Sequence, residues 1–232
     1  MPSISISKPT LRRPFKDINY CYWSPNGQRL YSLSRVIRDL GLKPDYEGVD
    51  ERVMRKAAAR GKLTEWYCFR LLEGKSVTVR SRHCGTLQKG VADRVQAFHR
   101  WALKYKPELV DYRRIVWDDH DAVAWEQDLR VRIAGRVWLV DIKCTSAVAK
   151  DWPLQLGCGL SYDQECERAA ILHLKPEFKD GYMFRDKWDS QYLRRVYQRA
   201  VHHWRCRRDF SQLKAELGFD SEAYGFEPEV DE

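Results

Sequence analysis

The stretch VAWEQDLRVRIAGRVWLVDIK, residues 123–143, decides the fold. β-Branched and aromatic side chains alternate with polar ones, as is typical of strands, and Ala134-Gly135 supplies a two-residue turn. The segment therefore predicts an antiparallel hairpin. In its first strand, alternation assigns Val123, Trp125, Gln127, Leu129, Val131 and Ile133 to one face, and Ala124, Glu126, Asp128, Arg130 and Arg132 to the other.

The register of this hairpin brings acidic residues together. A turn centred on Ala134-Gly135 places Asp128 opposite Asp141, and Glu126 opposite Lys143. Two facing carboxylates repel unless a cation lies between them, and hard oxygen ligands suit Mg²⁺ or Mn²⁺. Lys143 points the same way as Asp141, where it could orient water or stabilise charge on phosphorus. A solvated face, or an ion pair of Glu126 with Lys143, is the alternative, and spacing alone leaves both open.

Outward from the hairpin, helical and strand-like patterns predict an α/β fold. An aromatic hairpin is expected at 20–32, with Ser32 or Ser34 capping a short helix up to Gly41. Further helices are expected at 50–74, 90–105, 155–167 and 190–210, strands at 112–117 and 167–176, and a loop at 75–90. This order predicts a mixed central β-sheet flanked by α-helices. We expect an N-terminal arm (1–19), a single domain (20–210) and an acidic tail (211–232).

Composition narrows the class of protein. The net charge is +8, and residues 219–232 hold six acidic groups and no basic ones, so the remainder is more basic still. A basic protein surface of this kind attracts the phosphate backbone of nucleic acids. The seven scattered cysteines, without an export signal, favour reduced thiols over an iron–sulfur or zinc site, and the six histidines lack metal-ligand spacing. Without a membrane-spanning run or an apolar leader, we expect a cytoplasmic protein.

At these residues the chain resembles the PD-(D/E)xK nuclease superfamily, in particular its RecB-type and phage-encoded exonuclease-like members. The resemblance runs from about residue 15 to 208. It covers AAARGKL at 57–63, the DLRV and WLVDIK motifs of the hairpin, Gln155-Leu156, and RAAILHLKP at 168–176. It implies a restriction-endonuclease-like core.

The resemblance also implies roles for the hairpin residues. Asp128, Asp141 and the backbone carbonyl of Ile142 would hold Mg²⁺ or Mn²⁺, Lys143 would position the attacking water, and Gln155 would orient the lysine or the substrate. Three departures stand out. Thr64 occupies the position of a metal-binding histidine, which leaves Glu65 or Glu126 as its replacement. The small residue usual before the first aspartate is missing from Trp-Glu-Gln-Asp128, and Gly159 replaces an aromatic residue.

A metal-dependent deoxyribonuclease is the implied function, exonuclease-like and suited to DNA processing or recombination. It would act in the cytoplasm, that of the host cell if phage-encoded. DNA is the implied partner, with an oligomer and a recombination or replication protein left open. The expected DNA-binding residues are Arg60, Arg130, Arg194, Arg195, Arg199 and Tyr162. Two alternatives stay open: a nuclease fold that binds nucleic acid with weakened catalysis, and an interaction protein of a host or phage complex.

Overall fold

A mixed β-sheet forms the centre of the computed structural model, which describes residues 22–24, 27–43, 48–77, 87–145 and 148–216. Within these residues the sheet has seven strands. Neighbours are parallel where β2 meets β4 and where β5 meets β6, and antiparallel elsewhere. The strands are β1 (Tyr22–Trp23), β2 (Arg29–Ser32), β3 (Glu108–Asp118), β4 (Val123–Ile133), β5 (Arg136–Lys143), β6 (Arg168–Leu174) and β7 (Tyr182–Arg185).

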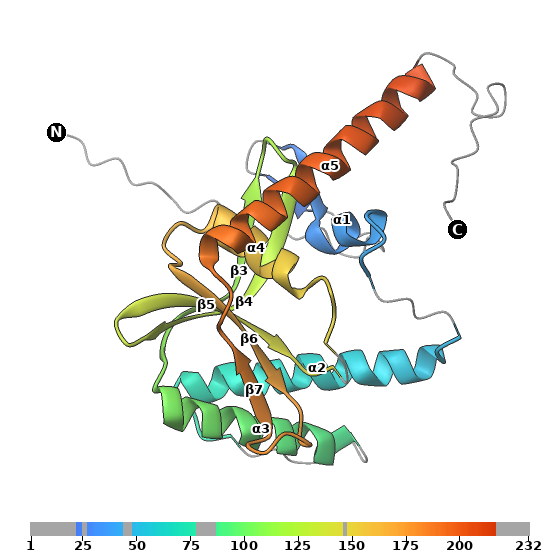
Figure 1. The fold of residues 1–232 in the computed structure, drawn as a ribbon. Coiled ribbons are helices and arrows are strands. Elements are labelled where there is room, and N and C mark those ends of the chain that lie inside the picture. Colours follow the sequence, from blue (N-terminus) through green and yellow to red (C-terminus); the bar gives the residue numbers. More distant parts are fainter. Residues whose placement is uncertain (1–21, 25–26, 44–47, 78–86, 146–147, 217–232) are drawn as a thin grey trace.

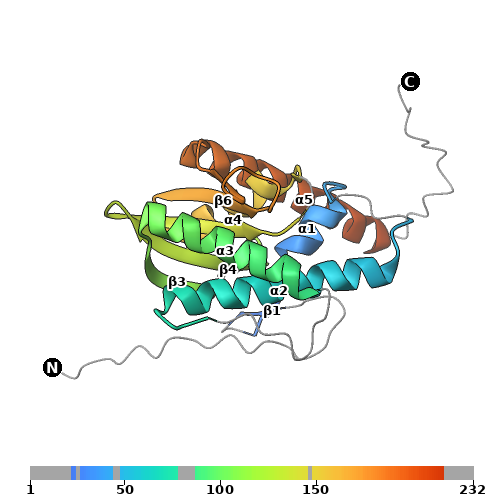
Figure 2. The same cartoon turned by 90° about the horizontal axis from the view of Figure 1, so that it is seen from below.

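Helices cover both faces of the sheet (Figures 1 and 2). The helices are α1 (Leu33–Asp39), α2 (Glu51–Leu72), α3 (Leu87–Tyr105), α4 (Trp152–Tyr162) and α5 (Ser190–Glu216). One core cluster joins Phe69 and Trp101 of α2 and α3 to Val140 of β5, and another joins Leu156 and Leu193 of α4 and α5 to the opposite face. The predicted fold class, a mixed central sheet flanked by helices, is confirmed. In the described part of the chain, no helix combines the length and apolarity needed to cross a membrane.

The β4–β5 hairpin has the predicted register. Ile133 pairs with Arg136 and Leu129 with Val140, around a turn in which Ala134 and Gly135 have φ of 49° and 79°. Two left-handed residues are the requirement of a type I′ turn, which matches the twist of a hairpin. The paired register stops at Leu129, because the start of β4 pairs with β2 instead. The ladder therefore contains neither the expected pair of Asp128 with Asp141 nor that of Glu126 with Lys143, because the two strands separate before they reach these residues.

The predicted alternation of faces holds within each half of β4 but not across Asp128. Trp125 packs with residues of α4 and α5, whereas Leu129 belongs to the cluster with α2 and α3. Gln127 lies close to Gly159 of α4, so the strand changes face beside Asp128. On β3, Arg113 lies at the level of Asp128 and has a left-handed φ of 54°. Such an irregularity twists a strand locally and redirects its side chains, which simple alternation does not anticipate.

Several element boundaries differ from those expected. Ser32, one of the two predicted caps, caps α1, and Asp50, the first residue of the expected second helix, is the N-cap of α2. Helix α4 begins at Trp152 because Pro153 suits a first turn, and α3 begins within the expected loop at 75–90. Strand β7 was not predicted, and α5 continues to Glu216, into the expected tail. The expected arm and the rest of that tail lie outside the described residues.

Two glycines let α4 lie close to its neighbours. A Cβ on Gly157 would come within 2.2 Å of the carbonyl oxygen of Leu193 in α5. A Cβ on Gly159 would come within 2.4 Å of Leu139 and 2.5 Å of Trp125, both on the sheet. The close packing explains why an aromatic residue is absent at position 159. It also holds Gln155, one turn earlier on α4, against the end of β5.

Candidate active site

The candidate site lies where β4 and β5 separate. The backbone N–H of Ile142 donates a hydrogen bond of 2.9 Å to Oδ2 of Asp128. Beyond the last backbone pair of β4 and β5, the Asp128 side chain therefore replaces a backbone carbonyl as the acceptor. In an extended strand the N–H and C=O of one residue point toward the same edge. The carbonyl of Ile142 therefore faces the side on which Asp128 lies, as expected for a backbone ligand beside this aspartate.

Lys143 connects β5 to α4 through short polar contacts. Its Nζ lies 2.6 Å from Oδ2 of the buried Asp141 and donates a hydrogen bond of 2.7 Å to Oε1 of Gln155. Burial opposes the charge of Lys143, but the carboxylates of Asp141 and Asp128 outweigh it and raise the pKa of its ammonium. Lys143 is therefore held as a cation between the sheet and α4.

Glu65 of α2 joins this group of acids. Burial first, and then the charge of Asp141, raise its pKa to about 7. Burial, Asp141 and Glu65 likewise raise the pKa of Asp128 well above its ordinary value. Three carboxylates thus compete for the cationic charge of Lys143.

Glu65 and Glu126 are the two candidates to replace the histidine that is absent at Thr64, and their contacts differ. Thr64 is buried and its hydroxyl donates to the carbonyl of Arg60 at 2.8 Å, within its own helix. Glu126 forms an ion pair of 2.7 Å with Arg113 of β3, whereas Glu65 interacts electrostatically with both aspartates. Of the two, Glu65 is the better placed to assist Asp128 and Asp141.

The chemistry of this donor set fits a hard divalent cation. Carboxylate oxygens and a backbone carbonyl are the ligands that Mg²⁺ and Mn²⁺ favour, and burial together with the neighbouring acids raises the pKa of Glu65 and of Asp128. Among the described residues, no group of three or more His, Cys, Asp or Glu side chains is already arranged to hold a metal. Nζ of Lys143 instead contacts Oδ2 of Asp141, so a metal at that oxygen would have to displace the contact.

Three of the expected DNA-binding residues have structural contacts instead. Arg130 is only 3% exposed, and its guanidinium is paired with Asp163 at 2.9 Å and with Glu165. Arg194 donates from Nε to the carbonyl of Leu160, and Tyr162 donates to Asp121. The assignment of Arg130 to DNA is therefore corrected, because its charge is buried among carboxylates. Arg194 and Tyr162 likewise join α4 to its surroundings.

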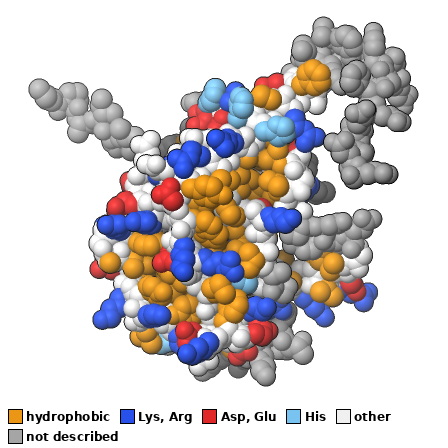
Figure 3. Space-filling model, viewed as in Figure 1, with side chains coloured by type: hydrophobic (Ala, Val, Ile, Leu, Met, Phe, Trp, Pro, Cys, Tyr) orange, Lys and Arg blue, Asp and Glu red, His pale blue; other side chains and the backbone are white. Residues whose placement is uncertain are grey.

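The remaining three lie on helices. Arg195 and Arg199 are exposed on α5, and Arg60 is half-buried on α2. On the face shown in Figure 3, Lys and Arg side chains form separate groups around an apolar band. This face therefore lacks a continuous basic track among the described side chains.

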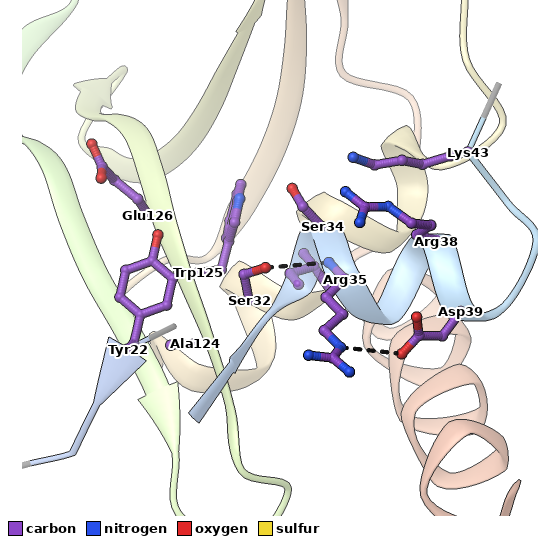
Figure 4. A pocket seen from close by; sticks show the side chains of 11 residues that line it. Tyr22, Ser32, Ser34, Arg35, Arg38, Asp39, Lys43, Ala124, Trp125 and Glu126 are labelled. Carbon is purple, nitrogen blue, oxygen red and sulfur yellow. Dashed lines mark hydrogen bonds and ion pairs between the residues drawn. The ribbon is translucent and has the colours of Figure 1, made fainter. Parts of the chain in front are cut away.

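A cavity of about 630 Å³ lies between α1, β1, β2 and β4, and its lining on β4 ends at Glu126, two residues before Asp128. Figure 4 shows Arg35, Arg38 and Lys43 on one wall, with Trp125 and Glu126 on the other. The sequence analysis did not single out these basic residues, because their common cavity is formed only when β2 pairs with β4.

Asp151 is a further residue that the sequence analysis missed. Its Oδ2 accepts a hydrogen bond of 2.7 Å from Nε2 of Gln155. The signal was present in the sequence, because residues four apart on a helix lie on one face. An Asp at 151 and a Gln at 155 form such a pair.

Comparison with known proteins yields only distant structural similarity. No family model matches the sequence, and no curated protein matches it. Among solved structures, the chain resembles an alkaline exonuclease, LHK-Exo, from Laribacter hongkongensis, with 13% identity over 82% of this chain and 93% of that one, and a TM-score of 0.43. LHK-Exo in complex with dAMP gives 14% identity over 81% and 92%, and a TM-score of 0.35. Since both overlaps are loose, we base the proposed function on this chain's own residues.

Proposed function

We propose that this protein is a Mg²⁺- or Mn²⁺-dependent deoxyribonuclease that hydrolyses phosphodiester bonds. The observation that carries the proposal is the acidic cluster beside Lys143, in which Asp141 lies 2.6 Å from the ammonium, Asp128 accepts the N–H of Ile142, and Glu65 interacts electrostatically with both aspartates. Acidic clusters that raise their own pKa values are costly to folding and are concentrated at functional sites. The resemblance of the hairpin and Gln155 to the PD-(D/E)xK pattern agrees with this chemistry.

In this proposal Asp128, Asp141 and the carbonyl of Ile142 hold the metal, and Glu65 supports them from α2. When bound, the metal would activate water and neutralise charge on the phosphate. Lys143 remains an ammonium, so it acts by positioning water and stabilising negative charge rather than by accepting a proton. Gln155 holds the ammonium through its Oε1.

The DNA strand would approach through the cavity beside the site. Arg35, Arg38 and Lys43 offer guanidinium and ammonium donors to a phosphate backbone, and Glu126 on the opposite wall lies two residues before Asp128. This approach replaces the buried Arg130 as the source of positive charge. It leaves Arg60, Arg195 and Arg199 as candidates for contacts farther from the reaction.

A second candidate function is nucleic-acid binding without cleavage. The contact between Lys143 and Asp141, together with Thr64 at the histidine position, favours it, since both weaken metal binding. The two functions differ in their response to metal: binding alone requires none.

Cleavage of end-labelled DNA tests the proposal. Linear and circular DNA, single- and double-stranded, would be incubated with EDTA, Mg²⁺ or Mn²⁺. We expect metal-dependent cleavage by the wild type, loss of cleavage in Lys143→Ala, and full activity in the control Lys179→Ala, which removes an exposed lysine. Sparing of circles would identify an exonuclease. DNA binding without cleavage in either metal would contradict the nuclease and support the second function.

A further inference from the structure

Asp151 is a buried carboxylate that the start of α4 does not need. It occupies the N-cap position and is only 7% exposed, but its side chain makes no capping hydrogen bond. An N-cap aspartate normally accepts the N–H of the second or third helical residue. Here the second residue is Pro153, which has no N–H, and the N–H of Leu154 already bonds the Asp151 carbonyl at 3.0 Å. The helix start therefore does not account for an acid at this position.

The carboxylate contacts Gln155 instead. The Gln155 amide donates from Nε2 to Oδ2 of Asp151 and accepts at Oε1 from the ammonium of Lys143, each at 2.7 Å. A carboxylate is only an acceptor and an ammonium only a donor. With these two partners at its opposite ends, the amide has one favourable orientation. Without Asp151, the amide could rotate and turn its NH₂ group toward Lys143.

We propose that Asp151 is a positioning residue of the active site, which fixes the amide of Gln155 and, through it, the ammonium of Lys143. The inference rests on the proposed nuclease function for its catalytic consequence. Asp151 itself touches none of the proposed metal ligands in any hydrogen bond or ion pair among the described residues. Its effect on the reaction is therefore expected to pass through Gln155.

Kinetic coupling between the two residues tests this role. We expect Asp151→Ala to lower kcat about 10- to 100-fold, as is common for residues that orient catalytic groups, with DNA affinity unchanged. Asp151→Asn keeps an oxygen acceptor and should recover most of the activity. In a Gln155→Ala background, Asp151→Ala should have no further effect. An equal loss of activity in that background, or no rescue by asparagine, would overturn the proposal.

A control variant separates positioning from helix capping. Asp50→Ala removes an N-cap that does cap its helix, through a 2.6 Å bond from the N–H of Arg52, and should lower the Tm without lowering kcat. A kcat defect in Asp50→Ala equal to that of Asp151→Ala would show that the loss of activity follows from lost stability, and would overturn the positioning role of Asp151.

A measurement on the metal-free protein keeps this inference separate from the proposed function. The side-chain amide signals of Gln155, assigned by their loss in Gln155→Ala, should show slow hydrogen exchange in the wild type. In Asp151→Ala they should exchange as fast as those of exposed glutamines. Unchanged exchange would contradict the proposal whether or not the wild type cleaves DNA. Protected signals in a wild type that fails to cleave would leave the orientation of Gln155 intact and refute only the nuclease.

Discussion

Asp128 and Arg130 lie two residues apart on β4, yet they belong to ionic clusters of opposite character. Around Arg130, the buried guanidinium meets the buried carboxylate of Asp163 at 2.9 Å, with Glu165 at the surface. Around Asp128, burial and then the charges of Asp141 and Glu65 raise its pKa, while Lys143 lowers it. The buried carboxylate of the first cluster has a guanidinium close to it, whereas in the second cluster carboxylates lie against one another.

This difference distinguishes charged side chains that stabilise the fold from charged side chains that serve a function. A buried pair of matched charges satisfies itself and gains little from a ligand, while removal of one partner is costly. An excess of like charge destabilises the folded protein until a cation binds. Substitutions in the first cluster should therefore change stability, and those in the second should change metal binding and catalysis.

The largest effect is expected at Asp141. Asp141→Asn removes a proposed metal ligand and the ion pair of Lys143, so cleavage should fall at least about 10³-fold, roughly 4 kcal/mol of transition-state stabilisation. Single-turnover kinetics in Mn²⁺ would measure it. The unfolding free energy should change far less, since a carboxylate is removed from an acidic cluster. Activity within a few-fold of wild type would exclude Asp141 from the reaction.

Arg130→Met should produce the opposite result. It leaves the buried carboxylate of Asp163 paired with the more distant Arg114, at 3.6 Å, and should lower the free energy of unfolding by up to about 3–5 kcal/mol. Urea unfolding would measure the loss. Cleavage and DNA affinity per folded molecule should remain unchanged. If stability were unaffected and DNA affinity fell, the original assignment of Arg130 to DNA would be reinstated.

The raised pKa of Glu65 should make the stability of the folded protein depend on pH. Its pKa of about 7 in the folded protein exceeds the ordinary value of 4.5. The folded state therefore keeps a proton that the unfolded state releases, and stability falls as pH rises from about 4.5 to about 7. Glu65→Gln should remove this loss and stabilise the metal-free protein by about 1–3 kcal/mol at pH 8.

Thermal unfolding at pH 5 and pH 8, with and without Mg²⁺, would measure the effect of Glu65. Mg²⁺ should raise the Tm of the wild type at pH 8 and have a smaller effect on Glu65→Gln. Equal pH dependence of the two proteins would remove Glu65 from the acidic cluster.

The smallest effect is expected at Glu126. Its partner Arg113 is half exposed, so Glu126→Gln should cost no more than about 1 kcal/mol and leave Mn²⁺-dependent cleavage within a few-fold of wild type. Urea unfolding and the same kinetic assay would check both values. A collapse of activity comparable to that of Asp141→Asn would mean that Glu126, not Glu65, assists the two aspartates.

The sequence by itself determined the local features of this protein. The Ala134-Gly135 turn sets the register of the hairpin, because two left-handed residues impose one geometry on the strands that flank them. Asp141 and Lys143 share a face because a strand repeats every two residues. The mixed sheet flanked by helices followed from the order of hydrophobic patterns along the chain.

Only the tertiary structure decided which charges meet. Glu65 lies in α2, far in sequence from the hairpin. Its choice over Glu126 as the acid that assists the two aspartates depends on how that helix packs on the sheet. The same holds for the burial of Arg130. The change of face at Asp128 lies beside a left-handed residue of the neighbouring strand, Arg113, which the alternating pattern of β4 does not reveal. Contacts between distant segments carry no local pattern, because packing selects them after each element has formed.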